Sequence, residues 1–222
     1  MTRRLQKHTM YHELVETFRQ VPCCAFCHLL ERDNRRYVES LLYEHVNDPA
    51  LRAELARKGG FCPRHAHQLA AVGDGLGAAR LYCDQISLFA RTLNGSAPLP
   101  AHPSPAGGAV KSCPTCAAEA AAFQGYSETL ALWWPDSDLR DAVARSPGLC
   151  APHLLGALPF FKDRSAARDL RLVHAAKFAA LAEELIQYIN KHDYRFSKDG
   201  FDAEGDSWLR AIDKMVGSKG LG

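Results

Sequence analysis

The sequence predicts an all-α protein made of two homologous helical repeats, each with a CxxC…CxxH metal site, followed by a short C-terminal helix. Three observations support this fold class: a duplicated pattern of cysteine and histidine, apolar residues at helical spacing, and almost no strand-like alternation. The 222 residues are 47% apolar and 23% charged, which is typical of a globular protein with a substantial core.

The duplicated pattern consists of two CxxC pairs and two CxxH pairs, in the order Cys24/Cys27, Cys62/His65, Cys113/Cys116 and Cys150/His153. The two pairs of the first copy are separated by 34 residues and those of the second copy by 33, so one deletion aligns the copies. Other residue types then align as well, for example Tyr37 with Tyr126 and Asp48 with Asp136. Duplication of a whole structural unit explains these matches better than a chance cysteine pattern.

The copies divide the chain into five predicted segments. These are an N-terminal helical arm at 1–21, the first repeat at 22–93, a linker at 94–112, the second repeat at 113–192, and a tail with a short helix at 193–222. The linker contains four prolines and the pair Gly107-Gly108, a composition that disfavours both helix and strand. A long surface loop inside one domain is an equally good interpretation of the same residues.

Each repeat is expected to contain the same series of helices. A helix follows the first cysteine pair, and a short helix spans Pro49 to Lys58, with Asp48 as its N-cap and Gly59-Gly60 as its end. A long amphipathic helix then closes each repeat. Its apolar positions are Tyr82, Ile86, Phe89 and Leu93 in the first copy, and Phe178, Leu181, Leu185 and Tyr188 in the second.

In the tail, Asp206 or Ser207 is expected to cap a short helix that carries Trp208, Leu209, Ile212 and Val216. This helix either docks on the repeats or exposes its tryptophan to a protein partner. The acidic residues around it do not follow the spacing of a calcium-binding EF-hand.

The cysteine pattern predicts two Cys3His sites, each holding a zinc ion. Two donors at i and i+3 lie on one face of a helical turn, so a CxxC and a CxxH together close a tetrahedron around an ion. The simplest grouping is local: Cys24, Cys27, Cys62 and His65 form one site, and Cys113, Cys116, Cys150 and His153 form the other. An exchanged grouping, in which Cys24 and Cys27 meet Cys150 and His153, remains open.

Other cysteine chemistries fit less well. Iron-sulfur clusters are the main alternative, because sequence spacing does not separate iron from zinc. Haem attachment at Cys24-Ala-Phe-Cys27-His28 is disfavoured, since the second copy has Ala117 in place of His28. A thioredoxin-like dithiol requires a βαβ context that a helical chain lacks. Cys23 and Cys83 lie outside the duplicated pattern and are expected to be packing residues, with an alternative ligand or a reactive thiol as the second interpretation of Cys23.

The overall composition limits the classes of function. The 27 Lys+Arg nearly balance the 25 Asp+Glu, so we expect no nucleic-acid partner, and no long apolar run suggests a membrane segment. Eight cysteines without a secretion signal indicate the cytoplasm. A site with four protein ligands leaves no position for substrate, so we expect a non-catalytic interaction or scaffold protein, with electron transfer or redox sensing as the iron-sulfur alternative. The oligomeric state is not predicted.

The sequence also resembles a family of bacterial and archaeal proteins of unknown function, whose members carry CPxC and GFCxxH signatures. The resemblance rests on the cysteine and histidine pairs, on 37–44, on Asn47-Asp48-Pro49, and on parts of the tail at 192–196 and 204–208. It covers most of the chain. The resemblance implies no activity and no catalytic residue.

Overall fold

The computed structural model describes residues 7–97, 113–192 and 200–218. These residues form helices and turns without a strand, which confirms the all-α prediction. The chain divides into two compact units: unit 1 comprises Met1–Leu29 and Phe123–Gly222, and unit 2 comprises 30–122. The boundaries fall inside helices α2 (Ala25–Ser40) and α6 (Pro114–Leu132), so each of these helices contributes residues to both units.

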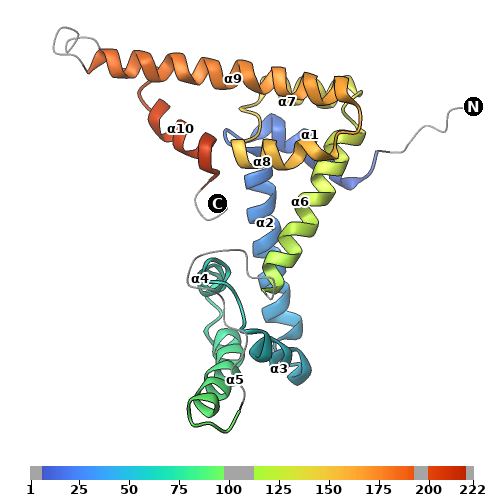
Figure 1. Ribbon diagram of the computed structural model, residues 1–222, viewed down its shortest axis with the longest axis vertical. Coiled ribbons are helices and arrows are strands. Elements are labelled where there is room, and N and C mark those ends of the chain that lie inside the picture. The colour runs from blue at the N-terminus through green and yellow to red at the C-terminus, as the bar shows by residue number, and fades with distance from the viewer. Residues whose placement is uncertain (1–6, 98–112, 193–199, 219–222) are drawn as a thin grey trace, which may run out of the picture. The chain divides into compact units, whose positions relative to one another are not determined.

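Unit 1 contains the first turn of α2, the second half of α6 and five further α-helices: α1 (Thr9–Gln20), α7 (Ser137–Arg145), α8 (Ala151–Ala157), α9 (Arg164–Lys191) and α10 (Ser207–Val216). A 3₁₀ turn, η2 (Leu158–Phe160), follows α8. Helix α1 packs against α7, and α10 lies against α8 and α9 (Figure 1). The fully buried side chains of Tyr11, Phe18, Leu139 and Leu170 lie in this unit.

Unit 2 contains the remainder of α2, a π-helical turn η1 (Leu41–His45), the start of α6 and three further helices: α3 (Pro49–Lys58), α4 (Pro63–Val72) and α5 (Gly75–Leu93). Helices α3 and α4 both contact α5 (Figure 1). The core includes Val38, Leu55, Leu69 and Leu81, and it extends to the buried cysteines 62 and 113. The core of unit 2 therefore surrounds two of the predicted metal ligands.

The short helix α3 follows the sequence prediction to the residue. The Asp48 carboxylate accepts a hydrogen bond from the Ala50 N–H at 2.8 Å, and Pro49 occupies the first helical position. Gly59 ends the helix with φ of 83°, in the left-handed region that favours glycine. The corresponding helix α7 begins in the same way, at Asp136. Helices α2 to α5 and helices α6 to α9 follow the two halves of the cysteine and histidine pattern in the same order, and the duplication of the unit stays a prediction.

The long closing helices α5 and α9 form as expected, but their apolar stripes are only partly buried. Ile86 is 66% exposed and Leu93 is 71% exposed, whereas Leu81, nearer the start of α5, is 1% exposed. In α9 the predicted stripe is better covered: Leu181 is buried and Phe178, Leu185 and Tyr188 are partly buried. Helical periodicity therefore predicted both helices correctly, but it overestimated the burial of the apolar stripe in α5.

Most of the predicted linker, 98–112, and the start of the tail, 193–199, lie outside the described residues. The predicted tail helix is present as α10, with Asp206 at its N-cap position. The Asp206 carboxylate makes no capping bond and instead accepts from Arg210 at 2.7 Å. Among the described helices, none has the length and apolar character needed to cross a membrane.

Candidate metal centres

The eight predicted ligands form two groups of four in the structure. The first group is Cys24, Cys27, Cys150 and His153, and the second is Cys62, His65, Cys113 and Cys116. Within each group the potential ligand atoms all lie within 4.8 Å of one another. All four members of the first group lie in unit 1, and all four members of the second group lie in unit 2.

This arrangement corrects the local grouping expected from the sequence. Cys24 and Cys27 do not meet Cys62 and His65; they meet Cys150 and His153. Each group therefore takes its CxxC pair from one sequence copy and its CxxH pair from the other, which is the exchanged arrangement. The reason is that α2 and α6 each pass through both units, so the cysteine pair that begins each helix lies in a different unit from the CxxH pair of its own copy.

The ligand pairs all lie at helix N-termini. Cys62 and Cys150 are the N-cap residues of α4 and α8, and each is followed three residues later by the histidine of its pair. The CxxC pairs lie in the same way at the starts of α2 and α6. A helix N-terminus carries a partial positive charge, which favours the thiolate form of a cysteine. Each group therefore combines two helix ends that stabilise negative sulfur.

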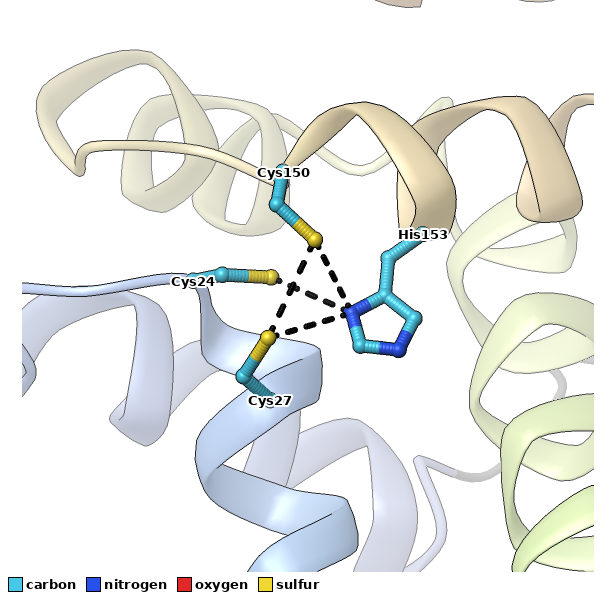
Figure 2. A group of neighbouring side chains, drawn as sticks. All are labelled: Cys24, Cys27, Cys150 and His153. Carbon is cyan, nitrogen blue, oxygen red and sulfur yellow. Dashed lines mark hydrogen bonds between the residues drawn. The ribbon is translucent and has the colours of Figure 1, made fainter. Parts of the chain in front are cut away.

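The first group is compact and buried (Figure 2). The Nδ1 atom of His153 lies 3.2 Å from the Sγ atom of Cys150, 3.4 Å from that of Cys27 and 3.5 Å from that of Cys24. The Sγ atoms of Cys27 and Cys150 are 3.8 Å apart. Figure 2 shows the three sulfur atoms and the imidazole nitrogen pointing toward one central point.

The second group has matching dimensions. The Nδ1 atom of His65 lies 3.2 Å from the Sγ atom of Cys62, 3.3 Å from that of Cys116 and 3.5 Å from that of Cys113. The Sγ atoms of Cys116 and Cys62 are 3.6 Å apart. Both histidines therefore direct the same ring nitrogen at three thiols. Burial acts to lower the pKa of His65, but hydrogen bonds led by the one to Cys113 raise it to about 9.

The first group is surrounded mainly by aromatic rings and by the C-terminal helix. The ring of His153 packs against Phe26 and Phe123, at centroid distances of 6.0 and 5.7 Å. The Ser218 N–H, just after α10, donates to the Sγ atom of Cys27 at 3.4 Å. A cavity of about 310 Å³ is lined by residues that include Cys24 and Cys150, and Lys214 of α10 lies at the same cavity.

The second group has a polar network behind its histidine. The Nε2 atom of His65 lies 3.2 Å from Oε2 of Glu119, and Arg64 donates to both oxygens of that carboxylate at 2.8 and 2.9 Å. Asn34 also donates to Glu119. Although burial opposes ionisation, the hydrogen bonds from His65, Arg64 and Asn34 lower the pKa of Glu119 to about 2.

A buried histidine supports the turn that leads into Cys150. The Leu149 N–H donates to Nε2 of His174 at 2.9 Å, and Nδ1 of His174 lies 2.8 Å from the carbonyl oxygen of Leu170. Gly148 has φ of 76°, and a Cβ atom there would lie 2.9 Å from Nε2 of His174. His174 therefore has a structural role: it holds the turn that precedes Cys150.

Sequence reasoning missed the network of Asn34, Arg64 and Glu119. A usable signal was the position of Glu119, one helical turn after Cys116 and on the same face of α6. The packing role expected for Cys83 is wrong, because this cysteine is exposed. Elsewhere in unit 2, the guanidinium of Arg52 lies 2.7 Å from the carboxylate of Asp84.

Comparison with known proteins identifies the family of the chain. The model of a family of unknown function, DUF6062, matches residues 6–220. The chain belongs to this family. It is also similar to an "uncharacterized 23.9 kDa protein in xynA 3'region" of Caldicellulosiruptor sp. (strain Rt8B.4), with 29% identity over 208 residues, 93% of this chain and 100% of that protein. No solved structure matches the chain. Membership of DUF6062 therefore assigns no activity, and the two Cys3His groups are the features that indicate a function.

Proposed function

We propose that the protein binds two structural zinc ions, one in each Cys3His group, and acts as a non-catalytic interaction or scaffold protein. The observation that carries the proposal is the spacing of the donor atoms. Zinc bonds of about 2.3 Å to sulfur and about 2.0–2.1 Å to nitrogen give a tetrahedron with edges of about 3.8 Å between sulfurs and about 3.6 Å between sulfur and nitrogen. Among the pairs in contact, Sγ–Sγ distances are 3.6–3.8 Å and Nδ1–Sγ distances are 3.2–3.5 Å.

The same spacing favours a single ion over an iron-sulfur cluster. In a cluster, cysteine ligands bind different iron atoms, so their donor atoms are spread around several metals and bridging sulfides. Here all four donors of a group lie within 4.8 Å of one another, which leaves room at the centre for one ion. Three sulfur donors and one imidazole are a common ligand set for structural zinc.

A structural role follows because protein ligands would fill all four coordination positions of the zinc ion. Four protein ligands satisfy tetrahedral zinc and leave no position for water or substrate, whereas a catalytic zinc site keeps one position open. Of the eight ligands, seven are buried and Cys116 is partly buried. Each ion would tie two helix N-termini together and so stabilise the unit that contains it. We place the protein in the cytoplasm, where thiols stay reduced; none of its eight cysteines forms a disulfide.

The proposed interaction surface is the outer face of α10. Its apolar side chains are 45–58% exposed: Trp208, Leu209, Ile212, Met215 and Val216. They follow helical spacing and form one stripe. Polar residues on the other side of the helix hold it in place, as Arg210 pairs with Glu184 and Lys214 donates to the carbonyl oxygen of Pro147. A protein partner suits this surface, since aromatic and aliphatic side chains dominate the energetics of protein interfaces.

Metal content and colour test the metal assignment. Protein purified without oxygen should be colourless and stable in air, and native mass spectrometry with elemental analysis should find two zinc ions per chain. Brown protein with broad visible absorption that bleaches in air would show that the groups bind iron-sulfur clusters and not zinc. Electron transfer or redox sensing would then be the favoured function. A folded chain without metal would overturn the proposal as a whole.

Partner binding is tested separately. A partner captured by the wild-type protein should be identified, purified and measured for binding to both the wild-type protein and Ile212→Asp. We expect the variant to keep two zinc ions but to bind at least tenfold more weakly. Equal binding by the two proteins would exclude α10 as the partner surface.

A further inference from the structure

The two Cys3His groups differ in what lies behind the histidine. At His65 the ring nitrogen that points away from the thiols, Nε2, lies 3.2 Å from a carboxylate oxygen of Glu119. At His153 the imidazole packs against the rings of Phe26 and Phe123, which also contact each other. The ligand atoms and their spacing are alike in both groups, so this difference lies entirely in the surroundings.

The difference arises at equivalent helix positions. The residue three places after the second cysteine of the CxxC pair is Glu119 in α6 but Leu30 in α2. The residue seven places after that cysteine is Asn34 in α2 but Phe123 in α6. Because of the exchange, Glu119 and Asn34 both serve the His65 group. Both polar residues, Glu119 and Asn34, therefore lie at the His65 group.

Glu119 is itself held in a fixed position. The guanidinium of Arg64, the residue before His65, contacts both carboxylate oxygens at 2.8 and 2.9 Å, and Asn34 donates to the same carboxylate. Asn34 is 2% exposed and His65 is completely buried. A carboxylate with three donors around it, one of them the imidazole of His65, can act as a firm acceptor for that ring.

We propose that Glu119 is a positioning residue that fixes the ring of His65 and strengthens it as a metal ligand, so that the Cys62 group retains its ion more firmly than it would without the carboxylate. A carboxylate that accepts from the distal N–H of a ligating histidine holds the ring orientation and raises the basicity of the nitrogen that binds the metal. Arg64 and Asn34 act through Glu119. This inference rests on the proposed metal binding and assigns a role to residues outside the ligand set.

The release of zinc from the full-length, reduced protein into a chromophoric chelator tests this role. We compare wild type, Glu119→Ala, Glu119→Gln and the control Glu39→Ala, which removes an exposed acid that pairs with Arg35 on the same unit. Outer carboxylate partners typically change metal affinity by about 10–100-fold. Glu119→Ala should therefore accelerate release of one of the two ions by about tenfold or more. Glu119→Gln keeps an oxygen acceptor and should be intermediate, and Glu39→Ala should match wild type.

A second measurement examines the hydrogen bond directly, first in the wild-type protein. In the zinc-loaded wild-type protein, the Nε2–H proton of His65 should exchange slowly with water and be visible by NMR, because it is buried and bonded to Glu119. In Glu119→Ala this signal should be lost, while the ring signals of His153 stay unchanged. A general loss of folding would alter both histidines and both release phases.

The outcomes separate this inference from the proposed function. Two bound zinc ions with release rates unaffected by Glu119→Ala would overturn the role of Glu119 and leave the metal assignment intact. Equal acceleration of both ions would show that Glu119 acts through the fold and would also overturn the role. If Glu119→Ala does not fold, rapid exchange of the His65 Nε2–H in wild type decides against the proposal. A wild-type protein without metal would remove both proposals.

Discussion

The Sγ atoms of Cys27 and Cys150 lie 3.8 Å apart, although Cys150 comes 123 positions after Cys27 in the chain. A local site would instead have joined Cys27 to Cys62, 35 residues away. The entropy lost on closing a loop grows with the logarithm of its length, so the longer closure costs about 1 kcal/mol more in an unconstrained chain. An ion that makes this link therefore constrains the chain more than a local site would.

Pairs of cysteine substitutions distinguish the two groupings by metal content. Cys27→Ser and Cys150→Ser should each remove one ion, and the double variant should still keep the other ion, because both residues belong to one group. Cys27→Ser combined with Cys62→Ser should remove both ions. Native mass spectrometry gives the count directly. The local grouping predicts the opposite result for the two double variants.

The eight residues that form the two groups could be identified from the sequence because the chemistry of each pair is local. Spacing of i and i+3 at a helix N-terminus places two donors on one side whatever the rest of the chain does. The same is true of α3, whose start at Asp48 and end at Gly59 depend on neighbouring residues alone. Such features are encoded within a few residues and are visible in a single sequence.

The grouping of the pairs and the network around Glu119 were not predictable in the same way. Any CxxC pair can close a tetrahedron with any CxxH pair. Which pairs meet depends on the unit in which each of the long helices α2 and α6 begins. Asn34, Arg64 and Glu119 come from three separate helices and meet only in the folded unit. Periodicity also overestimated burial in α5, since Leu93 lies in an apolar stripe yet is 71% exposed.

Loss of one ligand should affect the protein differently from loss of one core side chain. Cys62→Ser should remove one ion and destabilise unit 2, because metal binding is coupled to folding. Leu69→Ala, at a site 1% exposed in the same core, should cost about 2–5 kcal/mol and keep both ions. Thermal unfolding and metal content of the two variants provide the comparison.

Two surface substitutions serve as controls for Cys62→Ser. Cys83 is exposed and Leu93 is 71% exposed, so Cys83→Ser and Leu93→Ala should each change stability by no more than about 0.5 kcal/mol and keep both ions. Loss of an ion in Cys83→Ser together with retention in Cys62→Ser would show that the ligand assignment is wrong.

Glycines with positive φ allow the turn before Cys150 to be tested with a matched control. Gly148 and Gly73 have φ of 76° and 84°, so alanine at either position is strained by about 1–2 kcal/mol. A Cβ atom at Gly73 meets nothing within 4 Å, whereas at Gly148 it would lie 2.9 Å from His174. Gly148→Ala should therefore be the more destabilising variant and should also release zinc faster. Equal effects in urea unfolding and zinc release would contradict a role for this contact.

The titration of His174 should make the free energy of unfolding depend on pH, and a variant without this ring can isolate its contribution. Burial lowers the pKa of this ring to about 4, and the nearby charges of Lys214 and Lys177 act in the same direction. In an unfolded chain a histidine titrates near 6.5. The folded protein therefore binds fewer protons than the unfolded chain between these values. The stabilising contribution is complete above pH 6.5 and decreases as the pH falls toward 4.

The variant His174→Gln removes this titration while preserving the local contacts. Gln85 lies beside Gly60 as His174 lies beside Gly148, and it donates to the carbonyl oxygen of Leu81, four residues earlier, just as His174 contacts Leu170. Glutamine is thus a natural replacement at this position. Between pH 7 and pH 5 the wild-type protein should lose about 2 kcal/mol more unfolding free energy than the variant. Acid release of metal affects both proteins and cancels in the difference. Urea unfolding at several pH values measures this difference between the two proteins. If their unfolding free energies changed in parallel with pH, His174 would not be held neutral in the fold.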